Sequence, residues 1–380
     1  MNGIDYGNCC RGRRWNIKNA VIVQAKRTPI GKKGGVLKDV EPHQLAAPLL
    51  RHVAGNVTEH LNEVILGNVV GPGGNMARFA ALEAGLALSV SGMTIDRQCS
   101  AGLEAIRTAC LFIRAGAGTC YIAGGVESAS TSPFPKRARF SPAALGDPDM
   151  VVAAENVARH YGLTRDVQDA YALRSYELSW DAYTKGFYSE EVLPFGEFRS
   201  DEVFQKKRDM ARLIERAKPL VDADGTVTAA NSCGIHDGAA AVVVMEEQLA
   251  AELGMRAVLR FADSEVSGIH PNYPGMSPIP AIRALLARNG LTMEDIDLIE
   301  INEAFASKMI ACATELSIPY GKLNVSGGAL TTGHPYGASG AILVTRLFYE
   351  VQRRQDVNYV LAAIGSAGGI GLAVLFEVIR

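Results

Sequence analysis

An internal repeat constrains this sequence more than any other feature. The second half presents the same succession as the first: an apolar run, a second run leading through a turn of small residues into a long helical pattern, a third run, and a closing run. The matching segments are EVILGN (63–68) and DLIEIN (297–302), MTIDRQCSAGLEAIRTACLFIRAG (93–116) and LNVSGGALTTGHPYGASGAILVTRLFYEVQRR (323–354), CYIAGG (120–125) and YVLAAIG (359–365), and GAAAVVVM (238–245) and GLAVLFEVI (371–379). Two copies of one core therefore account for most of the chain.

Strand-like and helix-like patterns alternate along both copies, which indicates an α/β fold. The strand-like runs are apolar throughout, as in AVIVQA (20–25), a pattern typical of strands buried on both faces. Helical patterns separate them, for example over 75–86 and 103–116. The alternation predicts βαβ units and a largely parallel sheet with helices on its faces, with a strand opening the 323–354 segment as in 93–116.

The first half also carries an insertion. From about residue 129 to 228 the sequence becomes a loop containing Pro, Ser and Arg, followed by two amphipathic helical patterns. We therefore expect an N-terminal half over 19–250, including this insertion, and a C-terminal half over 251–380. The arginines of residues 1–18 precede no apolar run, so this segment does not match a secretory signal. We expect it to be a disordered extension of unknown role.

Charge and cysteine usage exclude several classes of protein. The 38 Lys and Arg residues nearly balance the 40 Asp and Glu residues, whereas a domain that binds nucleic acid is normally basic. No unbroken apolar stretch reaches the roughly 20 residues of a membrane span. The seven cysteines are irregularly spaced without a CxxC pair, which disfavours disulfides and a zinc site. We expect a soluble cytoplasmic protein with free thiols and no metal.

In sheets of this kind ligands bind beyond the carboxyl ends of the strands, so the turns that follow strands are the places to search. DRQCSAG places Cys99 after a strand and at the start of a helix, where free N–H groups and the helix dipole favour a thiolate. This position predicts a lowered thiol pKa and a nucleophilic sulfur. The alternative, a buried cysteine acting as a small hydrophobe, is our interpretation of Cys110, Cys120 and Cys312.

Two further turns carry polar side chains. In INEAFA, Asn302 and Glu303 lie between a strand and a helix, although Asn is also a common helix N-cap. SGGALTTGHPYGASG gathers five glycines around His334, and glycines let a backbone approach a ligand closely. A lone histidine is more often structural, but this one occupies the turn related by the repeat to the turn of Cys99. We therefore favour a role as general base or hydrogen-bond donor.

Taken together, these motifs resemble those of the thiolases. The resemblance covers residues from about 19 to the C-terminus. It rests on AVIVQAKRTPIGKKGG, DRQCSAGLEAI, GGVES, AAENVARHYG, NSCGIHDGAAAV, GMSPIPAI, INEAFA and NVSGGALTTGHPYGASGA, in this order and spacing. It implies a layered αβαβα fold of two pseudo-symmetric halves with an inserted loop subdomain that helps bind coenzyme A. It also implies an acyltransferase of acyl-CoA and fatty acid metabolism with no permanently bound cofactor, and a homodimer or homotetramer.

The resemblance assigns roles to individual residues. Cys99 would take the acyl group as a thioester, and His334 would activate Cys99. His334 and Asn302, the latter through a water, would line an oxyanion hole for the substrate thioester. The backbone N–H groups at Cys99 and near Gly368 would form a second hole for the tetrahedral intermediate, and each donor of such a hole is worth about 3 to 4 kcal/mol.

The sequence departs from the family at its second reactive cysteine. Thiolases usually carry this cysteine in a C-terminal CxGGGxG turn, where it moves the proton at the α-carbon of acetyl-CoA. Here the turn is AAIGSAGGIGLA, with Gly365 in that position or, after a shift of one, Ser366. A serine hydroxyl is a poor proton carrier at neutral pH. Cys233 in NSCGIHDG could substitute, or it could be a conservative replacement of the serine usual there.

Residues expected to bind coenzyme A lie in and after the insertion. Cys233 and Gly234 occupy the segment that contacts the pantetheine arm in the family. The cations Lys207 and Arg208 belong to a set suited to phosphates or simply to a solvated face. The set comprises Lys136, Arg137, Arg139, Lys206, Lys207, Arg208 and Arg212. The family's HMG before the AEN helix is DMV (149–151) here.

Three functions follow. The first is thiolytic cleavage of a 3-oxoacyl-CoA, or the reverse condensation of acetyl-CoA, through an acyl-cysteine at Cys99. The second keeps the acyl-cysteine but performs thioester hydrolysis or acyl exchange, because the second cysteine is missing. The third is a non-catalytic protein that binds acyl-CoA or a partner subunit.

Overall fold

The computed structural model describes residues 17–132 and 137–380, so Cys9, Cys10, Lys136 and nearly all of the N-terminal extension lie outside the described residues. Within the described ranges, ten strands form one sheet in the order β4-β3-β5-β6-β1-β7-β10-β9-β8, with the short β2 beside β6. The strands are β1 (Ala20–Arg27), β2 (Gly31–Lys32), β3 (Glu63–Gly67), β4 (Ser91–Ile95), β5 (Cys120–Glu127), β6 (His236–Glu246), β7 (Leu259–Gly268), β8 (Leu298–Ile301), β9 (Tyr359–Ser366) and β10 (Ile370–Val378).

The sheet consists of two similar halves that meet at β1 and β7, which pair through Val21–Arg260 and Ile22–Leu259. Outward from this junction, the order β1, β6, β5, β3, β4 is matched by β7, β10, β9, β8. The helices correspond as well: α1 (Pro42–Ala54), α2 (Met76–Glu83) and α3 (Ala101–Arg114) match α9 (Pro278–Asn289), α10 (Ala306–Glu315) and α12 (Tyr336–Glu350). The sequence repeat is thus a structural repeat.

The sheet is mixed, and the expectation of a largely parallel sheet is wrong. β3 pairs in parallel with β4 and β5, and β8 with β9, whereas the pairs formed by β6, β1, β7 and β10 are antiparallel. β9 and β10 are joined by a tight turn, which permits only antiparallel pairing. Strands buried on both faces are apolar in either direction, so their composition carries no signal of orientation.

The strand expected at the start of 323–354 is also absent, and its place is taken by one bridge between Leu323 and Ile299. Asn324 has φ 44°, a left-handed conformation that Asn tolerates better than most residues. Its side chain accepts a hydrogen bond from Ile301 N (2.9 Å) and donates one to Ile301 O (2.8 Å). The amide group therefore supplies the pairing that a strand backbone would otherwise provide.

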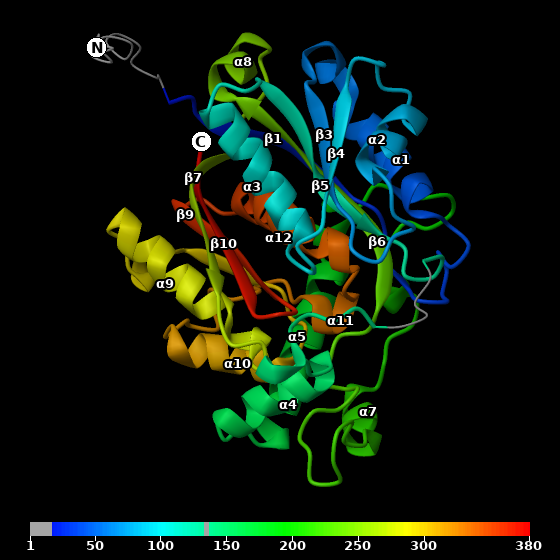
Figure 1. Cartoon of the computed structure of the whole chain (residues 1–380), viewed down its shortest axis with the longest axis vertical. Coiled ribbons are helices and arrows are strands. Elements are labelled where there is room, and N and C mark those ends of the chain that lie inside the picture. Colours follow the sequence, from blue (N-terminus) through cyan, green and yellow to red (C-terminus); the bar gives the residue numbers. More distant parts are fainter. Residues whose placement is uncertain (1–16, 133–136) are drawn as a thin grey trace, which may run out of the picture.

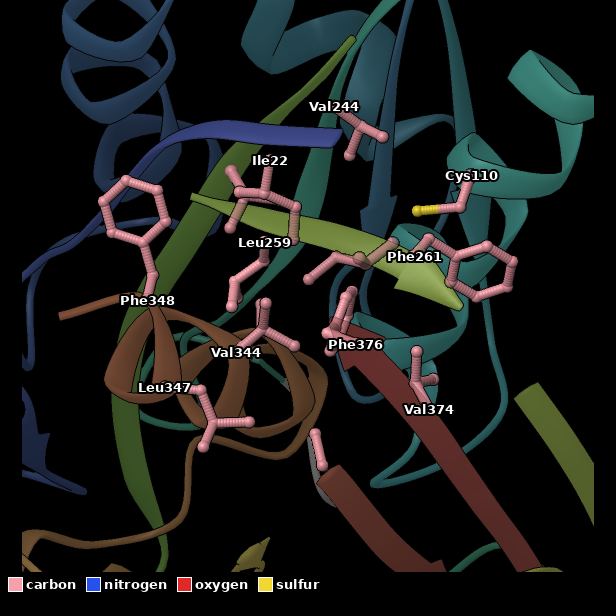
Figure 2. Packing of buried hydrophobic residues seen from close by; sticks show 14 of the residues in the cluster. Ile22, Cys110, Val244, Leu259, Phe261, Val344, Leu347, Phe348, Val374 and Phe376 are labelled. Carbon is pink, nitrogen blue, oxygen red and sulfur yellow. The ribbon is translucent and has the colours of Figure 1, made fainter. Parts of the chain in front are cut away.

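The two halves stack into five layers (Figure 1). α3 and α12 lie between the halves of the sheet, with α1 and α2 outside the first half and α9 and α10 outside the second. The central cluster around α3 and α12 includes Cys110, whose sulfur points among the apolar side chains (Figure 2). Cys120 and Cys312 are likewise fully buried, as expected for structural cysteines. None of the described helices is long and apolar enough to cross a membrane.

The insertion separates β5 from β6 and packs below the layers in Figure 1. Its helices are α4 (Met150–His160), α5 (Arg165–Thr184), α6 (Phe187–Glu191) and α7 (Met210–Arg216). A buried ion network ties it to the core, because Glu191 bridges Arg27 of β1 (2.7 Å) and Arg346 of α12 (2.9 Å). Two short helices, α8 (Glu247–Glu252) and α11 (Ala329–Thr332), complete the described α-helices.

Candidate active site

Cys99 lies in a strained turn between β4 and α3. The Asp96 carboxylate accepts a hydrogen bond from Gln98 N (2.8 Å), the local contact that makes Asp a turn former. Gln98 has φ 50°, a left-handed conformation that costs a non-glycine residue about 1 to 3 kcal/mol. Ser100 is the N-cap of α3, so Cys99 stands immediately before the helix, as the sequence predicts.

The hairpin turn between β9 and β10 is fastened beside Cys99 by Ser366. The fully buried Ser366 Oγ accepts a hydrogen bond from Ser100 N (2.8 Å) and lies 2.5 Å from Ser100 Oγ. Gly368 follows in the turn with φ 77°, a conformation suited to glycine. The contacts of Ser366 thus join the hairpin to the first turn of α3, and its hydroxyl is engaged by the neighbouring Ser100.

His334 is 2% exposed and held on both sides of its ring. Nδ1 lies 2.5 Å from Ser339 Oγ, which donates its hydrogen to Pro335 O (2.9 Å), so Nδ1 carries the ring proton. Nε2 then presents a lone pair, and Asn302 Nδ2 lies 3.4 Å from it as a donor. With the ring nitrogens assigned from these contacts, Nε2 is the atom that can accept a proton.

Glycines bring the turn of His334 against the turn of Cys99. A Cβ on Gly102, in the first turn of α3, would lie 2.6 Å from Gly337 O, and one on Gly340 would lie 2.4 Å from Leu103 N. Real Cβ atoms do not approach other atoms so closely, so only glycine permits α3 and α12 to start side by side. Helix packing thereby explains Gly340, one of the five glycines around His334.

Cys233 and Gly234 border the same site. Cys233 N donates to Ala304 O (2.9 Å), and Ile235 forms a bridge with His334. Cys233 is partly buried beside a small apolar cluster of Met150, Val151, Ala154, Val227, Ala304 and Phe305. Met150, which matches the methionine of the family's HMG, and Val151, which stands where that motif has glycine, therefore lie at this wall of the site.

Two buried charged residues lie here: Glu303, which the sequence places in the turn without indicating a role, and Lys308, which sequence reasoning missed. Glu303 is fully buried and accepts hydrogen bonds from Tyr171 (3.0 Å) and Ser175 (2.6 Å), which fix the turn after β8. Lys308 on α10 is 2% exposed and donates from Nζ to Asn302 O (2.8 Å). A lysine inside the apolar stretch ASKMIACA was the available signal for the second of these, because lysine is almost never fully buried without a partner.

Comparison with known proteins identifies the family to which the chain belongs. The thiolase N-terminal domain matches residues 20–248, and the thiolase C-terminal domain matches residues 255–378. The chain belongs to the thiolase family.

Similar proteins carry acetyltransferase names. The protein named "Putative acetyl-CoA C-acetyltransferase YhfS" of Bacillus subtilis is 60% identical over 95% of this chain and 100% of its own length. One named "Putative acetyl-CoA C-acetyltransferase VraB" of Staphylococcus aureus is 47% identical over 95% of this chain and 99% of its own. The crystal structure of the Bacillus anthracis acetyl-CoA acetyltransferase superposes with a TM-score of 0.89 at 36% identity, covering 96% of this chain and 99% of that chain. This thiolase is an acyltransferase enzyme.

At Gly365, one of the two candidate positions for the family's second cysteine, a neighbouring side chain occupies the space that a side chain would need. A Cβ on Gly365 would lie 2.7 Å from Ser277 Oγ and 2.9 Å from Pro274 O. The Ser277 hydroxyl donates to carbonyls of Pro274 (2.7 Å) and Ile370 (2.8 Å), which hold it in that space. A cysteine at residue 365 is therefore excluded by packing unless its neighbours move.

The acid–base state of this thiolase's site differs from the expectation for Cys99. Burial raises the pKa of the Cys99 thiol to about 12, despite opposing effects of the Lys308 charge and of a backbone hydrogen bond. Cys99 lies before a helix as expected, but its predicted low pKa is wrong, because desolvation of the thiolate outweighs the effect of the helix start. Burial also raises the pKa of Cys233 to about 12. Burial and the Lys308 charge lower the pKa of His334 to about 3, which keeps its ring neutral.

A basic groove lies on the insertion of this thiolase. It encloses about 380 Å³, and its charged lining consists of Lys32, Lys206, Lys207, Arg208, Arg212 and Arg216 together with the carboxylates of Glu202 and Asp209. An adjoining cavity of about 340 Å³ shares Arg208 and Arg216 and reaches Thr331, three residues before His334. Arg137 is instead paired with Asp147 (2.9 Å) and Asp149 (2.7 Å). Of the cations expected to bind phosphates, Lys206, Lys207, Arg208 and Arg212 line the groove, whereas Arg137 is already paired with two carboxylates.

Proposed function

We propose that this thiolase cleaves a 3-oxoacyl-CoA with coenzyme A, or runs the reverse condensation of acetyl-CoA, through an acyl-cysteine at Cys99. The proposal is carried by two observations: Asn302 Nδ2 lies 3.4 Å from His334 Nε2, and α3, which begins just after Cys99, packs against α12, which begins just after His334. The names of the similar proteins support acetyl-CoA as the substrate. The close packing of the second turn of α12 against α3 supports the proposal that His334 takes the proton of the Cys99 thiol directly.

The chemistry follows from the tautomer of His334. Its Nε2 lone pair accepts the proton of the Cys99 thiol, and the sulfur attacks the substrate carbonyl. The Nε2–H formed in this way then donates, together with Asn302, to the carbonyl oxygen of the substrate thioester. Backbone N–H groups at Cys99 and near Gly368 stabilise the oxyanion of the intermediate. Cleavage of the carbon–carbon bond leaves an acyl-cysteine and the enolate of acetyl-CoA, which takes up a proton at its α-carbon and departs. The thiol of coenzyme A then gives up its proton and takes the acyl group, which frees Cys99.

The basic groove is proposed to bind the phosphates of coenzyme A. Lys207 and Arg208 offer cations in a concave surface, and the adjoining cavity leads from them toward the turn of His334. Cys233 and Gly234 border the expected path of the pantetheine arm. Coenzyme A is substrate in this proposal, and no permanently bound cofactor is required.

The deciding experiment compares the thiolysis of acetoacetyl-CoA by coenzyme A in the wild type, Cys99→Ala and Cys233→Ser. We expect turnover in the wild type and in Cys233→Ser, and loss of turnover in Cys99→Ala. Turnover that survives Cys99→Ala would refute the acyl-cysteine. Acetylation of Cys99 without thiolysis would instead select hydrolysis or acyl exchange, the alternative that the missing second cysteine suggests.

We further propose two halves, 19–250 and 251–380, and a homodimer in the cytoplasm, with a tetramer as the next assembly. β4 is an edge strand, and exposed edges call for a partner. Phe79 (52% exposed), Leu82 (42%) and Leu88 (81%) are apolar residues close to it in the chain. Light scattering would test the proposal: the mass of a dimer is expected, and the mass of one chain would contradict it. The free thiols of the five described cysteines support a reducing compartment.

A further inference from the structure

Lys308 is an unusual residue for its place in the fold. It is the third residue of α10, where the helix dipole disfavours a positive charge, and its side chain is 2% exposed. Desolvating an ammonium costs several kcal/mol. Among the described residues, no carboxylate lies within ion-pair distance of Nζ, and its hydrogen bond goes to the neutral carbonyl of Asn302 (2.8 Å). The cost of this buried cation therefore needs another explanation.

The neighbours of Lys308 are the groups of the acyl-transfer site. Its hydrogen bond reaches Asn302, whose side chain lies against His334 Nε2. The carboxylate of Glu303 is occupied by Tyr171 and Ser175. The titratable groups that interact with Lys308 are Cys99, Cys233, Cys312, Glu303 and His334. Those that interact with Cys99 are Lys308, Cys233, Tyr336, Asp96 and Glu127. Among these groups that interact with Cys99, Lys308 is the cation.

We propose that Lys308 is a positioning residue whose ammonium is the counter-ion of the Cys99 thiolate. When the Cys99 S–H bond breaks and the proton moves to His334 Nε2, the electron pair left on sulfur faces this cation. Asp96 and Glu127 oppose the ionisation, and Lys308 offsets them. The hydrogen bond to Asn302 O holds the ammonium in place.

The same charge acts on His334, and this consequence rests on the proposed function. Lys308 lowers the pKa of the His334 ring, so an imidazolium formed during the reaction is a strong acid. Its Nε2–H bond is then poised to break as a C–H bond forms at the α-carbon of the departing acetyl-CoA. That proton transfer is the one for which this chain lacks the usual cysteine.

The test is the pH dependence of Cys99 alkylation by iodoacetamide, followed by peptide mass spectrometry. Lys308→Gln keeps a donor for Asn302 O but removes the charge, and Lys308→Arg keeps the charge. Lys322→Gln is the matched control, because Lys322 also donates to backbone carbonyls, those of Glu294 (2.9 Å) and Ile296 (2.7 Å). Circular dichroism establishes that each variant is folded.

We expect Lys308→Gln to raise the apparent pKa of Cys99 by about one unit, so that alkylation at neutral pH becomes about tenfold slower. Lys308→Arg should restore most of the rate, and Lys322→Gln should match the wild type. A Lys308→Gln profile that superimposes on the wild type would overturn the inference, as would a folded Lys308→Arg that is equally slow. No substrate is involved, so this result is independent of whether Cys99→Ala abolishes thiolysis.

Discussion

Replacing Ser366 by alanine distinguishes two roles for this residue: an anchor for the turn of Cys99, or a proton carrier in place of the family's second cysteine. The Ser366 hydroxyl accepts from Ser100 N at 2.8 Å and contacts Ser100 Oγ at 2.5 Å in a fully buried setting. Removing it leaves the buried Ser100 hydroxyl without a hydrogen-bond partner among the described residues, while Ser100 N keeps Arg97 O as its acceptor (3.1 Å). Such a loss costs about 1 to 3 kcal/mol of unfolding free energy. We therefore expect Ser366→Ala to be destabilised by that amount.

The assay combines denaturant unfolding with the pH profile of thiolysis. Because Ser366 anchors the turn of Cys99, we expect a moderate decrease in kcat with the shape of the pH profile unchanged. Ser132→Ala is the control, since Ser132 Oγ is buried with no hydrogen-bond partner in the described part of the chain, and its loss should leave stability nearly unchanged. Unaltered stability of Ser366→Ala together with abolished thiolysis would refute the anchoring role and identify Ser366 as the proton carrier.

Three further outcomes are expected. Gly365→Cys should lower the unfolding free energy by about 1 to 3 kcal/mol through overpacking against Ser277. The double variant Gly365→Cys with Ser277→Gly should recover part of the lost stability. Equal stability of the single variant and the wild type in denaturant would contradict the overpacking. Buried Arg346 and Arg27 lower the pKa of Glu191 to about 2, so its stabilisation is present above pH 4.5 and lost as the pH falls toward 2. The difference amounts to about 3 kcal/mol, and Glu191→Gln should remove this acid dependence in unfolding curves, whereas exposed Asp181→Asn should retain it. Reversing Lys207 and Arg208 to Glu should raise the KM for coenzyme A at least about tenfold with kcat kept, and an unchanged KM would remove the groove from the binding site.

The repeat, the element order and the turns of Cys99, Asn302 and His334 could be predicted from the sequence because they depend on local patterns. Strand direction could not, since β6 and β10 are apolar on both faces and would be so in either orientation. The strand missing at Leu323 depends on the Asn324 side chain replacing backbone contacts, which no periodicity indicates.

The acid–base properties of the site were also beyond local reasoning. The helix start at Ser100 favours a thiolate at Cys99. The pKa of the thiol also depends on how much water the folded chain excludes from it, and this desolvation is the larger effect, so the pKa is raised. Lys308 reaches the site from another element, and its role depends on neighbours brought together by the fold. Gly365 likewise owes its identity to Ser277, a contact between residues far apart in the sequence.

The most direct measurement is the mass of the Cys99 peptide after the protein is mixed with acetyl-CoA and quenched in acid. One acetyl group on Cys99 in the wild type is expected, with none on this segment in Cys99→Ala, and its loss on adding coenzyme A should regenerate acetyl-CoA. A wild-type protein that turns over acetoacetyl-CoA while Cys99 remains unmodified throughout would contradict acyl transfer through this cysteine.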